Sequence, residues 1–135
     1  MKRTAGGRRG AVVAQSDPGL GELGSALLEA LDLRVEVVRT ASDAIDRLRD
    51  GAGFIDLMLS GVELEGTPDG YGLARRVSVL WPTVSLILTA PRNQHPRGPL
   101  PGGAVVIQKP WLPLDLVAAA ERAARADHTV RAVRY

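Results

Sequence analysis

The sequence predicts an α/β domain built on a doubly wound, five-stranded parallel sheet. Three observations lead to this prediction. Short apolar segments alternate with amphipathic segments at intervals of about 25 residues, which is the pattern of βαβ units. The apolar segments are too short for buried helices. Most of the amphipathic segments follow a residue that can cap a helix. Right-handed crossovers should then place helices on both faces of the sheet.

Five segments are expected to be strands because they are apolar or β-branched and lack helical periodicity. The third is apolar almost throughout, as in a strand that is buried on both faces. The expected strands are Ala11–Ala14, Val35–Val38, Phe54–Leu59, Thr83–Leu88 and Ala104–Ile107.

Four segments are expected to be helices because apolar residues recur in them at helical spacing. Asp17 and Pro18 provide a cap and a first-turn proline for the first helix. Ser42 is expected to cap the second helix and Asp69 the third, and Gly51 and the Trp81-Pro82 pair should end them. The expected helices are Gly19–Leu31, a second one from Ser42 to Gly51, a third one from Asp69 to Leu80, and a last one from Pro113 to Ala124.

The segment Pro91–Gly103 interrupts this alternation. It holds four prolines and three glycines, so it cannot form a normal helix. We therefore expect a (βα)5 arrangement whose fourth helix is lost or reduced. Its loss should leave an apolar surface beside the fourth and fifth strands, and we expect a homodimer through that side.

Composition excludes several classes of function. The chain has no cysteine, which rules out disulfides and thiolate metal sites. No apolar run is long enough for a membrane span and no signal sequence is present, so we expect a cytoplasmic protein with no membrane partner. Residues 1–10 and 127–135 are basic and are expected to be flexible tails around a domain of residues 11–126. Glycines interrupt the first tail and no aromatic residue is interleaved, so nucleic-acid binding is not expected.

In a doubly wound sheet, the functional crevice lies at the carboxyl ends of the strands. The residues that follow the expected strands are therefore candidates for the site. They are the pairs Gln15-Ser16, Ser60-Gly61, Thr89-Ala90 and Lys109-Pro110.

These residues carry a resemblance to the receiver domains of two-component response regulators, which have a flavodoxin-like fold. The stretch IDLMLSGVELEGTPDGYGLARRV resembles the third strand, active-site loop and third helix of that family. LILTA resembles its fourth strand, and VIQKPW resembles its fifth strand with the Lys-Pro pair. The resemblance covers residues 11–126. It implies a phosphoryl acceptor aspartate after strand three, an acidic Mg²⁺-binding pair after strand one, a hydroxyl residue after strand four and a lysine after strand five.

The chain matches only part of this set. Thr89 falls on the hydroxyl position, and Lys109 and Pro110 fall on the lysine and on the proline that is cis in the family. The acidic pair falls on Gln15 and Ser16, which are neutral. The acceptor falls on Gly61, which has no side chain to phosphorylate, and the family's aromatic switch position falls on Val106. The resemblance therefore implies a vestigial pocket of Gln15, Ser16, Gly61, Thr89, Lys109 and Pro110 that holds no metal.

Other residues are given structural roles. Asp56 lies at the start of its strand, at the wrong end of the sheet for an acceptor, and is interpreted as a residue that caps the start of the strand. Ser60 should point to the opposite face from residue 61. Lys109 is expected to be a remnant that pairs with Glu63 or Asp17. His95 and His128 are isolated in polar surroundings, and Trp81 and Trp111 are expected to cover the core.

The sequence therefore predicts a stand-alone receiver-like module without enzymatic activity or a cofactor, and without a DNA-binding output domain. It should act by contact with a protein partner, such as a histidine kinase or another regulator, and remain unphosphorylated. Two alternatives stay open. One is an active but atypical phospho-receiver, and the other is a flavodoxin-like domain that binds a small ligand.

Overall fold

A computed structural model of the chain describes residues 9–51, 53–92, 100, 103–108 and 113–125. Strands and helices alternate along the described chain except between the last two strands. The elements are β1 (Gly10–Ala14), α1 (Pro18–Glu29), β2 (Arg34–Val38), α2 (Ala41–Asp50), β3 (Ile55–Gly61), α3 (Gly70–Leu80), β4 (Ser85–Ala90), β5 (Val105–Gln108) and α4 (Pro113–Arg125).

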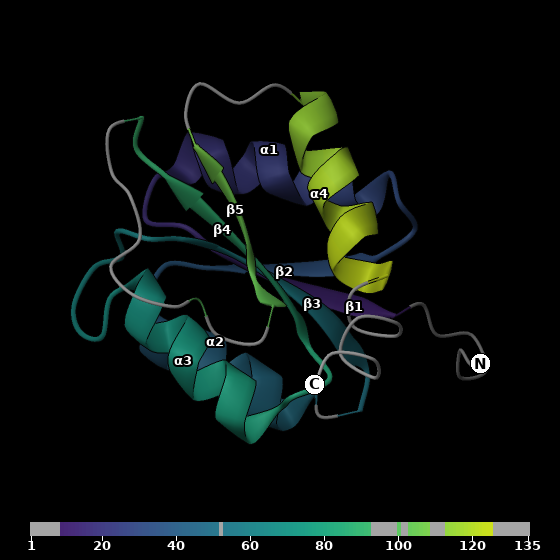
Figure 1. Cartoon of the computed structure of the whole chain (residues 1–135). Coiled ribbons are helices and arrows are strands. Elements are labelled where there is room, and N and C mark those ends of the chain that lie inside the picture. Colours follow the sequence, from purple (N-terminus) through teal and green to yellow (C-terminus); the bar gives the residue numbers. More distant parts are fainter. Residues whose placement is uncertain (1–8, 52, 93–99, 101–102, 109–112, 126–135) are drawn as a thin grey trace.

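The strands form one parallel sheet in the order β2-β1-β3-β4-β5. Helices α1 and α4 cover one face of it, and α2 and α3 cover the other (Figure 1). This is the flavodoxin-like order, with its switch point between β1 and β3. The described residues between β4 and β5 form no α-helix. The predicted doubly wound sheet with its fourth helix lost is therefore confirmed.

The core consists of two apolar layers, one on each face of the sheet. Because side chains alternate along a strand, even-numbered residues of β1, β3 and β4 face α2 and α3, whereas odd-numbered ones face α1 and α4. Val12, Met58 and Leu88 lie in the first layer, and Val13, Leu59 and Ile87 lie in the second. All six side chains are at most 1% exposed. This alternation also fixes which strand-end residues share a face.

The helices begin where capping chemistry allows. Asp17 accepts hydrogen bonds from the backbone N–H groups of Gly19 and Leu20, and Asp69 accepts one from Gly72, so both predicted caps are confirmed. The prediction of Ser42 as a cap is wrong. Thr40 caps α2 instead, since its hydroxyl accepts from the N–H of Asp43 at 3.1 Å. None of the described helices is both long and apolar enough to cross a membrane.

The central strands run further than their apolar segments suggested. Gly61 pairs with Thr89 in the ladder between β3 and β4, and Ala90 pairs with Gln108 of β5. The N–H of Val62 then donates to the carbonyl of Thr89 at 2.9 Å. The predicted loop pairs Ser60-Gly61 and Thr89-Ala90 are therefore the last residues of strands. Hydrogen bonding between neighbouring strands extends regular structure into glycine and polar residues that propensity alone assigns to loops.

Strand β4 is covered in the structure, whereas the sequence predicted a thinly covered surface beside it. All six residues of β4 are buried. Leu100, Ala104 and Val106 pack against the core layer of α2 and α3, and so does Trp81. None of the large exposed hydrophobic residues of the described chain lies on β4 or β5. β4 is therefore covered, whereas β5 is only partly buried, and the homodimer through this side stays a prediction.

Asp56 lies at the amino-terminal edge of the sheet, away from Gly61 at the other end of β3. Its carboxylate does not cap a strand, which corrects the sequence interpretation. It accepts a hydrogen bond from Nε of Arg9 at 2.8 Å and a second one from Nη2 of the same guanidinium. The backbone carbonyl of Arg9 also accepts from the N–H of Arg34 at 2.8 Å. Arg9 thus joins the residues before β1 to the starts of β2 and β3.

Candidate functional site

The carboxyl ends of β1, β3 and β4 bring together Gln15, Gly61 and Thr89. All three are odd-numbered and lie on the face of α1 and α4, in line with the alternation of the strands. The side chains of Gln15 and Thr89 are 5% and 4% exposed. Nε2 of Gln15 donates to Oγ1 of Thr89 at 3.1 Å, which spans 74 positions of sequence. The buried amide and hydroxyl therefore satisfy each other.

The Gln15 side chain also fills the space in front of Gly61. A Cβ atom added to Gly61 would lie 2.9 Å from Oε1 of Gln15 and 3.4 Å from its Cδ. Any side chain at position 61 therefore has to displace the amide. Ser60, in contrast, points away, as predicted. It is fully buried on the other face, and its hydroxyl donates to the carbonyl of Gly61 at 2.9 Å.

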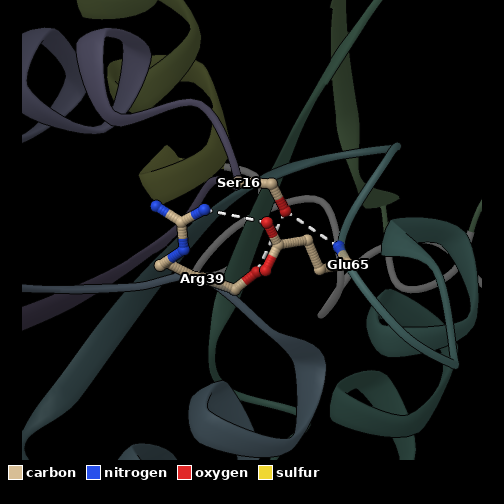
Figure 2. Close-up of polar contacts among 3 residues, drawn as sticks. All are labelled: Ser16, Arg39 and Glu65. Atoms are coloured by element: carbon tan, nitrogen blue, oxygen red, sulfur yellow. Dashed lines mark hydrogen bonds and ion pairs between the residues drawn. The ribbon is translucent and has the colours of Figure 1, made fainter.

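Ser16, Arg39 and Glu65 form a polar network that links three loops (Figure 2). The Ser16 hydroxyl donates to the backbone carbonyl of Arg39 at 3.1 Å and accepts from the backbone N–H of Glu65 at 2.8 Å. The Arg39 guanidinium pairs with the Glu65 carboxylate at 2.8 Å. The backbone of Glu65 also forms an isolated β-bridge with Thr40. The loop after β3 is thereby tied to the ends of β1 and β2.

Arg39 and Glu65 were not among the residues predicted from the sequence. Arg39 follows β2 directly, so it would have been found had the rule on strand ends been applied to the second strand. Glu65 gave no such signal. It lies four residues beyond the end of β3, and its position depends on the path of the loop.

A shallow hollow of about 230 Å³ opens over these strand ends. Two carboxylates line it, those of Asp17 and Glu63, and both residues are exposed. Asp17 already accepts hydrogen bonds from the first turn of α1. Within the described ranges, no three His, Cys, Asp or Glu residues are close enough together to hold a metal ion. Protein Mg²⁺ sites usually include one or two carboxylates among their oxygen ligands, and Gln15, Ser16 and Gly61 carry none.

Lys109 and Pro110, the remaining residues of the expected pocket, lie outside the described residues. The same holds for His95, His128 and Trp111, so the roles expected for them stay predictions. Trp81 is partly buried against the core, as expected. Val106 lies in β5 and is partly buried there.

Several solved receiver domains have the same architecture. The signal receiver domain of an HD domain-containing protein from Pseudomonas fluorescens superposes with a TM-score of 0.75 at 22% identity, covering 93% of each chain. The chain has the receiver-domain fold. A response regulator receiver protein from Sinorhizobium medicae gives a TM-score of 0.74 at 20% identity, over 89% of this chain and 97% of that one.

The receiver domain of NtrX from Brucella abortus gives a TM-score of 0.72 at 18% identity, over 85% of this chain and 98% of that domain. No protein-family model matches the sequence. The likeness to these structures is therefore one of fold. The strand-end residues described above lie at the carboxyl edge of the sheet, where open α/β sheets commonly bind ligands.

Proposed function

We propose that the chain is a receiver-like signalling module that works by protein contact and is not itself phosphorylated. Its partner would be a histidine kinase or another regulator. The receiver fold supports the signalling role, and the neutral residues at the strand ends support the loss of phosphorylation. The observation that carries the proposal is the buried bond between Gln15 and Thr89, because the Gln15 amide occupies the space in front of Gly61.

Phosphoryl transfer to a protein needs a side-chain nucleophile and stabilisation of the charge on the transferred group. Glycine at position 61 supplies no nucleophile. Gln15 and Ser16 supply no negative charge for a divalent cation. In addition, Gln15 engages the Thr89 hydroxyl, which is the group that would contact a phosphoryl oxygen. The proposed module therefore lacks catalytic activity and needs no cofactor.

The network of Ser16, Arg39 and Glu65 supports a single fixed surface at this edge. It links loops that would otherwise be joined only by the backbone. A module that does not switch must present a constant surface to its partner, and these three exposed contacts each add a small preference for one conformation of the loop after β3. We infer that this edge is held in one state by contacts within the chain.

The test of the proposal is exposure to a small phosphodonor such as acetyl phosphate with Mg²⁺, followed by mass spectrometry of the intact protein. We expect no added phosphate, because the position at the end of β3 has no side chain. A covalent phosphate on any residue that lines the hollow would refute the proposal. It would favour the alternative of an active, atypical receiver, for which the exposed Glu63 carboxylate at the rim is the available acceptor.

Magnesium provides a second prediction. A ligand that binds only the native state at 100 times its Kd adds about 2.7 kcal/mol to the free energy of unfolding. Because the hollow lacks a cluster of acidic ligands, millimolar Mg²⁺ should leave the melting temperature unchanged relative to an equal ionic strength of NaCl. A rise specific to Mg²⁺ that disappears in a Glu63→Gln variant would contradict this expectation.

A further inference from the structure

Strand β2 is an edge of the sheet with free hydrogen-bonding groups. The N–H of Arg34 donates to the carbonyl of Arg9, and the carbonyl of Val38 accepts from the N–H of Gln15, so residues 34, 36 and 38 face β1. The N–H and C=O groups of Val35 and Val37 therefore point outward, since they alternate along a strand. No described strand lies beyond β2. This row of groups is a template for one more strand.

The side chains of β2 leave room for such a strand. Val37 is 48% exposed beside a hollow of about 370 Å³ between β2 and α1. On the other face, Arg34 and Glu36 line a hollow of about 400 Å³ next to α2. Glu36 pairs with Nε of Arg47 at 3.0 Å, and both groups are about half exposed. Arg34 has no ion-pair partner among the described residues.

We propose that β2 pairs antiparallel with β2 of a second copy of this chain, with Val35 opposite Val35. The two sheets then join into one across a twofold axis. The two Val35 residues form a pair of backbone hydrogen bonds with each other, because the N–H and C=O of Val35 point away from β1. Arg34 of each copy lies opposite Glu36 of the other on the α2 face. On the α1 face, Val37 lies opposite Leu33.

Charge selects this register over its neighbours. Only odd-numbered residues have outward backbone groups, so the pairing can slip only in steps that keep odd residues opposite odd ones. A shift in one direction places Glu36 opposite Glu36, and a shift in the other places Arg34 opposite Arg34. Like charges directly opposite each other destabilise a strand pair. In the proposed register, opposite charges meet twice, and Glu36 lies between Arg47 of its own chain and Arg34 of the other.

The residues at the carboxyl ends of the other strands take no part in this contact, so the proposal is independent of the phosphorylation state. It also differs from a dimer through β4 and β5, which are at the other side of the sheet. A surface that is self-complementary under a twofold rotation fits a second copy better than an unrelated strand.

Charge exchange tests the proposal. Arg34→Glu places two acidic residues on the strand, and Glu36→Arg places two basic ones. Each variant alone should have a dimer Kd at least about tenfold higher than that of the native chain in sedimentation equilibrium. An equimolar mixture should associate again, because every cross-strand charge pair in the heterodimer is then opposite. The double variant Arg34→Glu/Glu36→Arg should also dimerise.

The matched control is Arg75→Glu, an exposed arginine on α3 without an ion pair in the described chain, which should leave self-association unchanged. Thermal melting of each variant verifies that it is folded. A native chain that stays monomeric up to about 1 mM overturns the proposal. So does undiminished dimerisation of the single variants, which would put the contact elsewhere, or a mixture of folded variants that does not associate.

Discussion

Replacing Gly70 with alanine should destabilise the domain by about 3 kcal/mol, because its Cβ would have no space. The new atom would overlap the backbone carbonyl oxygen of Gly61 and lie 2.6 Å from Cα of Val62. These are backbone atoms of the last residue of β3 and of the residue after it, so they cannot rotate away as a side chain can. Gly70 also donates its N–H to the carbonyl of Val62 at 2.9 Å, so moving α3 would break a bond.

The matched control is Gly19→Ala, in the first turn of α1. There the nearest atom to a new Cβ is Oδ1 of Asp17 at 3.4 Å, an ordinary contact. Alanine also favours helix over glycine, so this variant should lie within about 0.5 kcal/mol of the native chain or be slightly more stable. Urea unfolding compares the two variants. Equal stabilities would mean that α3 does not approach β3 as closely as the structure has it.

The fold was predictable because several local signals agree. The apolar segments were long enough to mark all five strands, and Asp17 and Asp69 marked two of the helix starts. The start of α2 was misplaced because Thr40 and Ser42 are both good capping residues, and only the backbone geometry selects between them. Local capping preferences rank such positions but do not separate two good candidates that are two residues apart.

The ends of β3 and β4 were placed too early for a different reason. Strand propensity ends where the sequence becomes polar or small, but the ladder continues through the pair of Gly61 and Thr89. Pairing between strands is a tertiary interaction, so it overrides the propensity of single residues. The cover over β4 was also beyond the reach of the sequence, since it depends on where residues such as Leu100 pack.

The placement of the candidate residues at the strand ends was predictable, and their contacts were not. Alternation along the strands placed Gln15, Gly61 and Thr89 at one edge and Ser60 on the opposite face. The bond between Gln15 and Thr89 depends on a side-chain rotamer and on the register of three strands. The role of Ser16 changed most, because a residue interpreted as a lost metal ligand holds Arg39 and Glu65 in place. Function proposed from such positions therefore needs their contacts as well as their identities.

Restoring phosphorylation should require three substitutions together. The acceptor variant Gly61→Asp alone introduces a Cβ 2.9 Å from Oε1 of Gln15. The Gln15 amide must then shift, and if its bond to Thr89 is lost, the buried polar groups left unpaired cost about 1–3 kcal/mol. The new carboxylate also has no metal ion beside it. We expect little or no phosphate on this single variant after treatment with a phosphodonor and Mg²⁺.

Adding Gln15→Asp and Ser16→Asp should give measurable phosphorylation of residue 61. Aspartate is shorter than glutamine, so it frees the space in front of position 61, and the added carboxylates supply the oxygen ligands that Mg²⁺ prefers. Ser16→Asp keeps an acceptor for the N–H of Glu65 and loses only the bond to the carbonyl of Arg39.

The matched control carries Gly61→Asn with the same two substitutions, since a carboxamide cannot form an acyl phosphate. Mass spectrometry of the digested protein locates the phosphate. Phosphate on the asparagine control would show that another residue accepts it, and a folded triple variant without phosphate would show that the strand ends have moved too far from the geometry that phosphoryl transfer requires.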